Sequence, residues 1–158
     1  MTRIYLASPL GFAASTASFM ADLVGRLSFH YEVSNPWDED EFDADFQRAA
    51  AMDSVSARYG LLHRIDMELG RRNEQRIRQA DALIAILDGV DVDSGTASEI
   101  GFAYALDKRI DGLRTDFRLA GDNAGSIVNL QVEYFIEASG GSIYASTDAL
   151  IAGVSAQD

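Results

Sequence analysis

Short apolar runs alternate along this chain with longer segments whose apolar residues recur every three or four positions. The run from 82 to 87 is unbroken and rich in Ile and Leu, as is typical of a central strand buried on both faces. Phe19, Leu23 and Leu27 are spaced by four, which predicts one buried face of a helix from 14 to 28. The pattern therefore favours an α/β protein.

The same reasoning along the whole chain predicts five strands separated by helices. Strands are expected at 3–7, 31–34, 82–87, 109–113 and 141–145. Helices are expected at 14–28, 46–79 (one or two, broken near 58–60), 94–107, 126–138 and 147–154, the last capped by Thr147. Strands alternating with helices imply a parallel sheet covered on both faces. We expect a flavodoxin-like or Rossmann-like three-layer sandwich with about five strands.

The length and hydropathy of the chain are those of one globular domain, residues 1–158. No apolar run approaches the roughly 20 residues that a membrane span requires. The first residues enter a strand-like pattern directly, with no basic and apolar leader. The expectation is a soluble, cytoplasmic protein.

Charge and cysteine usage exclude several kinds of partner. A formal net charge of -12 argues against binding to nucleic acid or to an anionic membrane, because both require a basic face. With no cysteine there can be no disulfide, thiolate metal site or Cys nucleophile. His30 and His63 lack ligand-like spacing, so no metal is expected. Lys108 is the only lysine, which suits either a halophilic source or a GC-rich genome.

Acidic residues concentrate in two places. One is the run from 38 to 45, interpreted either as a solvated face or as the mouth of a site. The other follows the strand at 82–87, where a turn rich in Asp and Gly leads into the next helix. Such a turn is where an open α/β sheet usually binds its ligand. Asp91, Asp93 and Glu99 in this stretch look placed for chemistry.

Two carboxylates at this spacing suit cleavage of a glycosidic bond. Glu99 would lie in the first turns of a helix, whose dipole favours the ionised form that acts as a nucleophile. A second carboxylate, kept protonated by its neighbours, could give a proton to the leaving group. The alternative is structural: Asp93 caps the helix, and Glu99 is a solvated residue of its first turn.

Several blocks of sequence together resemble the nucleoside 2-deoxyribosyltransferase family. They are Ile-Tyr-Leu-Ala-Ser-Pro at 4–9, the segment 80–89, Asp-Ser-Gly-Thr-Ala-Ser-Glu at 93–99 with its continuation to 103, Gly-Leu-Arg-Thr-Asp-Phe-Arg at 112–118, and Asn-Leu-Gln at 129–131. The resemblance implies a flavodoxin-like enzyme that moves a 2-deoxyribosyl group from one nucleobase to another in nucleoside salvage. It implies no metal and no organic cofactor.

The resemblance also assigns roles to individual residues. Glu99 would be the nucleophile that forms a covalent deoxyribosyl intermediate. Asp93 would exchange a proton with the base, with Asp91 in reserve, and Tyr5 would hydrogen-bond the nucleophile. Gly95 lies in the turn between the two carboxylates and is expected to contact substrate.

Four further positions concern substrate binding and assembly. Asn129 falls where family members lend an Asn to the site of a neighbouring subunit, with Gln131 as its companion, so a homodimer or hexamer with shared sites is expected. Asn73 stands where some members carry a base-contacting Asp. Ser8 replaces a Gly found in many members and would tighten the pocket floor.

Two other functions fit the same residues. One is an N-glycoside hydrolase acting on deoxynucleosides or their 5′-monophosphates, in which water replaces the second base. The other is a non-catalytic nucleotide-binding module, against which the presence of Tyr5, Asp93 and Glu99 together argues. The preference for purine or pyrimidine, and for deoxyribose or ribose, stays open at this level.

Overall fold

The computed structural model, which describes residues 1–38 and 40–156, contains a five-stranded parallel sheet. The strand order is β2-β1-β3-β4-β5, the order of flavodoxin-like proteins, so the predicted fold class is confirmed. Tyr5 pairs with Leu83 in the register of the two central strands. The strands are β1 (Arg3–Ala7), β2 (Glu32–Ser34), β3 (Ala82–Ile86), β4 (Arg109–Leu113) and β5 (Ile143–Tyr144).

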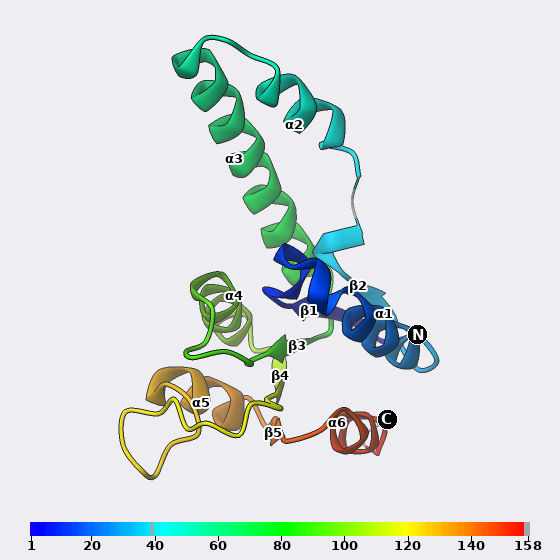
Figure 1. The fold of residues 1–158 in the computed structure, drawn as a ribbon. Coiled ribbons are helices and arrows are strands. Elements are labelled where there is room, and N and C mark those ends of the chain that lie inside the picture. Colours follow the sequence, from blue (N-terminus) through cyan, green and yellow to red (C-terminus); the bar gives the residue numbers. More distant parts are fainter. Residues whose placement is uncertain (39, 157–158) are drawn as a thin grey trace.

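Helices cover both faces of this sheet (Figure 1). Side chains of α1 and α6 pack against one face of the sheet, and side chains of α3, α4 and α5 pack against the other. The helices are α1 (Ala17–Leu27), α2 (Asp43–Ala50), α3 (Val55–Gln79), α4 (Ser94–Ala105), α5 (Leu130–Ala138) and α6 (Thr147–Ser155). Short 3-10 turns are η1 (Leu10–Phe12), η2 (Ala14–Thr16) and η3 (Pro36–Asp38).

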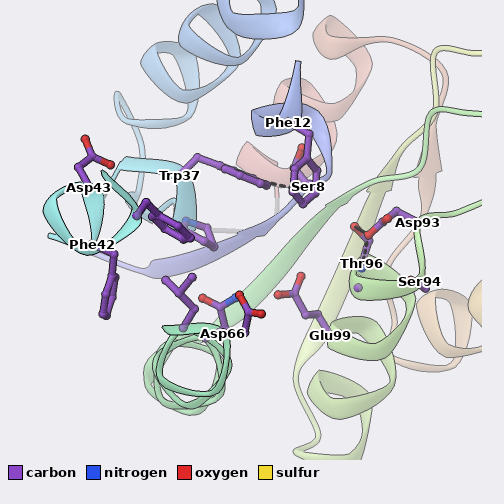
Figure 2. A pocket seen from close by; sticks show the side chains of 15 residues that line it. Ser8, Phe12, Trp37, Phe42, Asp43, Asp66, Asp93, Ser94, Thr96 and Glu99 are labelled. Atoms are coloured by element: carbon purple, nitrogen blue, oxygen red, sulfur yellow. Dashed lines mark hydrogen bonds between the residues drawn. The ribbon is translucent and has the colours of Figure 1, made fainter. Parts of the chain in front are cut away.

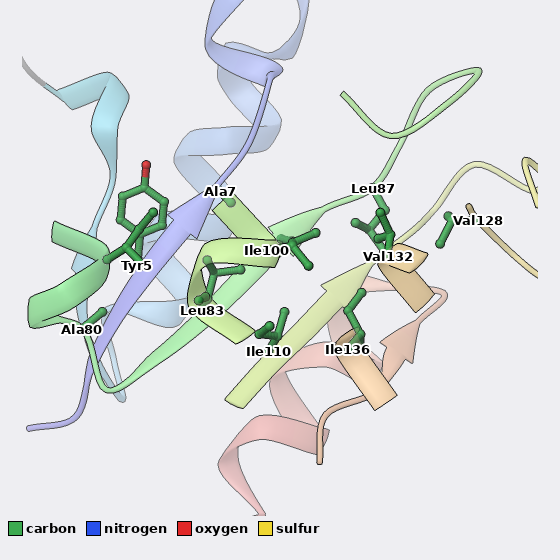
Figure 3. Close-up of a cluster of buried hydrophobic side chains, with 13 residues drawn as sticks. Tyr5, Ala7, Ala80, Leu83, Leu87, Ile100, Ile110, Val128, Val132 and Ile136 are labelled. Atoms are coloured by element: carbon green, nitrogen blue, oxygen red, sulfur yellow. The ribbon is translucent and has the colours of Figure 1, made fainter. Parts of the chain in front are cut away.

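The unbroken apolar strands supply both faces of the core. In β1, Ile4 and Leu6 face the α1 and α6 layer, whereas Tyr5 and Ala7 face the α3, α4 and α5 layer. In the second layer the ring of Tyr5 belongs to the buried cluster of Figure 3, and its hydroxyl points away from that cluster. Tyr5 thus contributes its ring to the core, and its hydroxyl is a polar group at the edge of that core.

Helices α2 and α3 form an arm that extends beyond the sheet (Figure 1). A small cluster of Ala49, Leu61 and Ile65 holds the two helices together. The break predicted near 58–60 is wrong: α3 runs through Gly60, and the interruption lies at 51–54, where Ser54 caps α3. A glycine in a helix costs about 1 kcal/mol relative to Ala. Packing of Leu61 and Ile65 against α2 outweighs that cost.

Two helix starts also differ from prediction. The helix expected from 126 begins at Leu130, because the side chain of Asn129 accepts a hydrogen bond from the amide of Gln131 and caps it. The last helix is capped by Ser146, whose hydroxyl accepts from the amide of Ala149, so Thr147 is its first residue. Among the described residues, no helix is both long and apolar enough to cross a bilayer.

Candidate active site

A pocket of about 800 Å³ lies where the loops after β1 and β3 meet the α2 and α3 arm. Carboxyl ends of neighbouring parallel strands are where this fold class binds ligands. Its walls come from segments far apart in the sequence (Figure 2). The lining residues are Ser8, Phe12, Pro36, Trp37, Phe42, Asp43, Phe46, Asp66, Leu69, Asn73, Asp93, Ser94, Gly95, Thr96 and Glu99.

Glu99 projects from the second turn of α4 into this pocket (Figure 2). The hydroxyl of Tyr5 donates a hydrogen bond of 2.6 Å to Oε1 of Glu99, although the two residues are 94 positions apart. The Tyr5 ring is fully buried, so the donor has little freedom to move. The interpretation of Glu99 as a solvated surface residue is therefore wrong.

Burial determines the acidity of this pair. Desolvation raises the pKa of Glu99, the Tyr5 hydrogen bond opposes that rise, and the charge of Asp93 adds to it. The helix start was expected to favour the ionised form, but in the folded pocket the loss of water has the larger effect. Desolvation and the neighbouring Glu99 carboxylate also raise the pKa of Tyr5, which keeps its hydroxyl protonated as a donor.

Asp93 both caps α4 and lines the pocket. Its Oδ2 accepts a 3.0 Å hydrogen bond from the amide of Thr96, whereas Oδ1 has no hydrogen-bond partner within the described part of the chain. A Cβ at Gly95 would lie 3.0 Å from Asp93 Oδ2. The predicted capping role and a position at the pocket thus coexist, and Gly95 leaves space for the carboxylate.

Aromatic side chains form the wall opposite α4. Trp37 is 39% exposed, and its indole N–H donates a 2.8 Å hydrogen bond to the carbonyl of Ser8. Phe12 meets the Trp37 ring edge-on with centroids 4.6 Å apart. A Cβ at Gly11 would overlap the indole, so only glycine allows this approach. Together with Phe42 and Phe46, these rings offer flat apolar surfaces of the kind on which a nucleobase stacks.

Ser8 and Asn73 also line the pocket, as predicted for residues that contact substrate. The Ser8 hydroxyl accepts a hydrogen bond from the amide of Leu10, which holds the turn after β1. Asn73 projects from α3, and its side chain makes no hydrogen bond to any described residue. The amide of Asn73 is therefore available to a ligand.

Four predicted residues do not line this pocket: Tyr5, which reaches it only through its hydrogen bond to Glu99, and Asp91, Asn129 and Gln131. Asp91 is exposed and accepts a hydrogen bond from the neighbouring amide of Val92. Asn129 and Gln131 lie at the start of α5, where the Asn129 side chain accepts from the Gln131 amide at 3.0 Å and donates to Asp122 at 3.5 Å. Within one chain, Asp91, Asn129 and Gln131 stabilise local turns.

Several pocket residues were not singled out from the sequence. Phe42 and Asp43 belong to the acidic run, so its second half lies at the pocket, as one of its two interpretations held; Glu39 of that run lies outside the described residues. Asp66 lies on α3 two turns before Asn73. The spacing of seven, which places both on one helix face, was the available signal.

Within residues 1–38 and 40–156, no three His, Asp or Glu side chains come together in a way that could hold a metal ion. The polar groups of the pocket are carboxylates, hydroxyls and one side-chain amide. The chemistry they offer is nucleophilic attack and proton transfer at a bound organic ligand.

Comparisons with known proteins agree with this architecture. The model of the nucleoside 2-deoxyribosyltransferase family, a family of enzymes, matches residues 4–131. The chain belongs to the nucleoside 2-deoxyribosyltransferase family, as its sequence motifs predicted. No curated protein sequence matches it.

Solved structures of similar fold cover nearly the whole chain. A conserved protein of Enterococcus faecalis matches with a TM-score of 0.68 and 24% identity over 100% of this chain and 99% of its own. A 2-deoxyribosyltransferase of Leishmania mexicana matches with a TM-score of 0.64 and 25% identity over 96% and 95%. A CMP N-glycosidase of Clostridium botulinum matches with a TM-score of 0.58 and 19% identity over 98% and 99%.

Proposed function

We propose that this protein transfers a 2-deoxyribosyl group between nucleobases through a covalent deoxyribosyl ester of Glu99. The observation that carries the proposal is the hydrogen-bonded Tyr5–Glu99 pair, which presents a carboxylate at the pocket beside a second carboxylate, Asp93. Family membership supports the type of reaction, and the likeness to the Leishmania enzyme supports the same assignment.

The proposed reaction has two displacements at C1′ of the sugar. The Glu99 carboxylate attacks C1′, and the C1′–N bond breaks with its electron pair leaving on the base, which takes a proton from Asp93. A second base then attacks C1′ from the opposite face and gives its proton to Asp93, while Glu99 leaves as a carboxylate. Two inversions give net retention, with ping-pong kinetics.

The composition of the pocket favours nucleosides over their 5′-phosphates. Four lining residues are acids, namely Asp43, Asp66, Asp93 and Glu99, and none of the described lining residues is Arg, Lys or His. A phosphate would enter this pocket against like charge, with no cation to balance it. A hydrolase remains the second candidate, because a CMP N-glycosidase shares the fold and water could replace the incoming base.

One incubation distinguishes the candidates. The protein is mixed with deoxyinosine, with and without adenine, at low and at molar salt, and the products are separated by chromatography. Deoxyadenosine formed only when adenine is present would support transfer. Free deoxyribose released at the same rate in both mixtures would favour hydrolysis. Turnover only in molar salt would support a halophilic source.

A cytoplasmic location of the protein stays a prediction.

Replacing Tyr5 tests how the nucleophile is kept ionised. Tyr5→Phe removes the hydrogen bond that lowers the pKa of Glu99, so the pKa rises further above its usual value. Because the reaction needs ionised Glu99, the acid limb of kcat/KM should move to higher pH, with about a tenfold loss at pH 7. Tyr59→Phe, on an exposed part of α3, is the matched control. An unmoved acid limb would remove Tyr5 from this role.

We also propose that Asn129 completes the site of a neighbouring subunit. It lies outside the pocket of its own chain, and the nearby side chains of Leu130 and Tyr134 are 54% and 55% exposed, which suits a subunit contact. Asn129→Asp should keep the helix cap but lose the amide donor, lowering activity about tenfold or more. Mixed oligomers with Glu99→Ala chains should regain activity. If verified mixed oligomers stay inactive, the site is not shared in this way.

A further inference from the structure

Asp66 is a carboxylate of the pocket that lies on α3, away from the Tyr5–Glu99 pair. Asp66, Leu69 and Asn73 line the pocket from one face of α3. At 1.5 Å per residue, Asp66 lies about 10 Å closer to the N-terminus of α3 than Asn73 does. Figure 2 shows Asp66 on the side of α3 that is turned toward Glu99.

Several other acids on or beside this arm are paired with arginine. Glu68 pairs with Arg71 at 2.6 Å, and Glu41 pairs with Arg72 at 2.5 Å. Asp66 has no ion pair and no hydrogen bond with any residue that the structure describes, and the pocket lining supplies no described cation. Its carboxylate oxygens are therefore left for a bound ligand or for water.

An ionised carboxylate can only accept hydrogen bonds, which makes it selective among nucleobases. Adenine and cytosine present an exocyclic amino group, a donor, at the position where hypoxanthine and uracil present a carbonyl oxygen, an acceptor. Two acceptors that face each other at contact distance repel, and each occupies the place of the donor that the other needs. Trp37, Phe42 and Phe46 line the pocket and offer apolar ring faces to either kind of base, so they supply no discrimination between the two.

We propose that Asp66 is a specificity-determining residue that selects nucleobases with an amino group at C6 of a purine or C4 of a pyrimidine, namely adenine and cytosine, over their oxo counterparts hypoxanthine and uracil. The inference rests on the proposed function, since it treats the pocket as the site of the base. Asn73, whose amide can donate or accept, reads the base without this bias. The selectivity thus comes from a residue two helical turns away from Asn73.

The test compares ratios, because amino and oxo bases differ in their intrinsic ability to leave. The kcat/KM ratio of deoxyadenosine to deoxyinosine, and that of deoxycytidine to deoxyuridine, is measured for the wild type, Asp66→Asn and Asp53→Asn. Asp53 is exposed in the α2–α3 connection and does not line the pocket, so it serves as the matched control. Asp66→Asn should lower both ratios about tenfold, whereas Asp53→Asn should leave them within about twofold.

Binding of free bases supplies a second measurement that does not depend on turnover. Titration calorimetry should give tighter binding of adenine than of hypoxanthine to the wild type, and the difference should shrink in Asp66→Asn. Unchanged ratios in Asp66→Asn with transfer intact would overturn the role of Asp66 and leave the proposed function standing. Absence of all turnover would overturn the proposed function. In that case equal affinities, or no binding, would overturn the inference as well.

Discussion

Glu99→Gln should reduce 2-deoxyribosyl transfer by about 10⁴-fold or more, the largest effect expected of any single substitution in this chain. An amide has no ionisable oxygen, so it cannot form the ester that links the two displacements. The Oε1 atom of Gln can still accept the Tyr5 hydrogen bond, so the geometry of the pocket should persist. Initial rates and mass spectrometry of the quenched protein, which detects the deoxyribosyl adduct, measure both consequences.

The same substitution should not destabilise the protein. Burial raises the pKa of Glu99 in the folded state, so the folded protein loses stability as pH rises through that value. Gln removes the ionisation, so at pH 7 Glu99→Gln should unfold at the same temperature as the wild type or at a higher one. The gain in the free energy of unfolding should be about 1 kcal/mol at most. At pH 4 the two should be nearly equal.

Glu137→Gln changes an exposed glutamate of α5 that lies outside the pocket and should leave transfer unchanged. Substantial transfer by Glu99→Gln, or by Glu99→Ala, would remove Glu99 as the nucleophile. An adduct found on the wild type at another residue would reassign that role.

Asp93→Asn should reduce transfer by about 10²- to 10⁴-fold, the usual contribution of a general acid or base. Asn caps a helix as well as Asp does, so α4 and the amide of Thr96 should keep their geometry. The loss then reports proton transfer and not the collapse of the loop. The loss of transfer should be smallest for bases that leave readily without a proton. Across a series of substrates, the fold loss should therefore grow as the base becomes a poorer leaving group.

Asp91→Asn is the matched control for this substitution. Asp91 belongs to the same loop but is exposed and outside the pocket, where it accepts a hydrogen bond from Val92 that Asn can also accept. Its substitution should change transfer less than about twofold if Asp93 is the acid. A larger loss for Asp91→Asn than for Asp93→Asn would instead make Asp91, the reserve candidate, the proton donor.

Local patterns in the sequence were enough to predict the order of the elements. These patterns arise within single strands and helices, whose side-chain directions repeat every two or 3.6 residues. Examples are the unbroken apolar strand at 82–87 and the spacing of Phe19, Leu23 and Leu27. Boundaries were less well predicted. Gly60 was expected to break a helix, but packing of the arm carries α3 through it.

The candidate site, too, was predicted from the sequence in part. The sequence by itself determined the block that carries Asp93, Gly95 and Glu99, because a strand, a turn and a capped helix are local structures. The family resemblance predicted the hydrogen bond from Tyr5 to Glu99, but only the tertiary structure decided that Asp66 shares the pocket of Glu99. It also decided that burial raises the pKa of Glu99 against the effect of the helix start. Contacts between distant segments and the exclusion of water arise from packing of the whole domain, which no local pattern encodes.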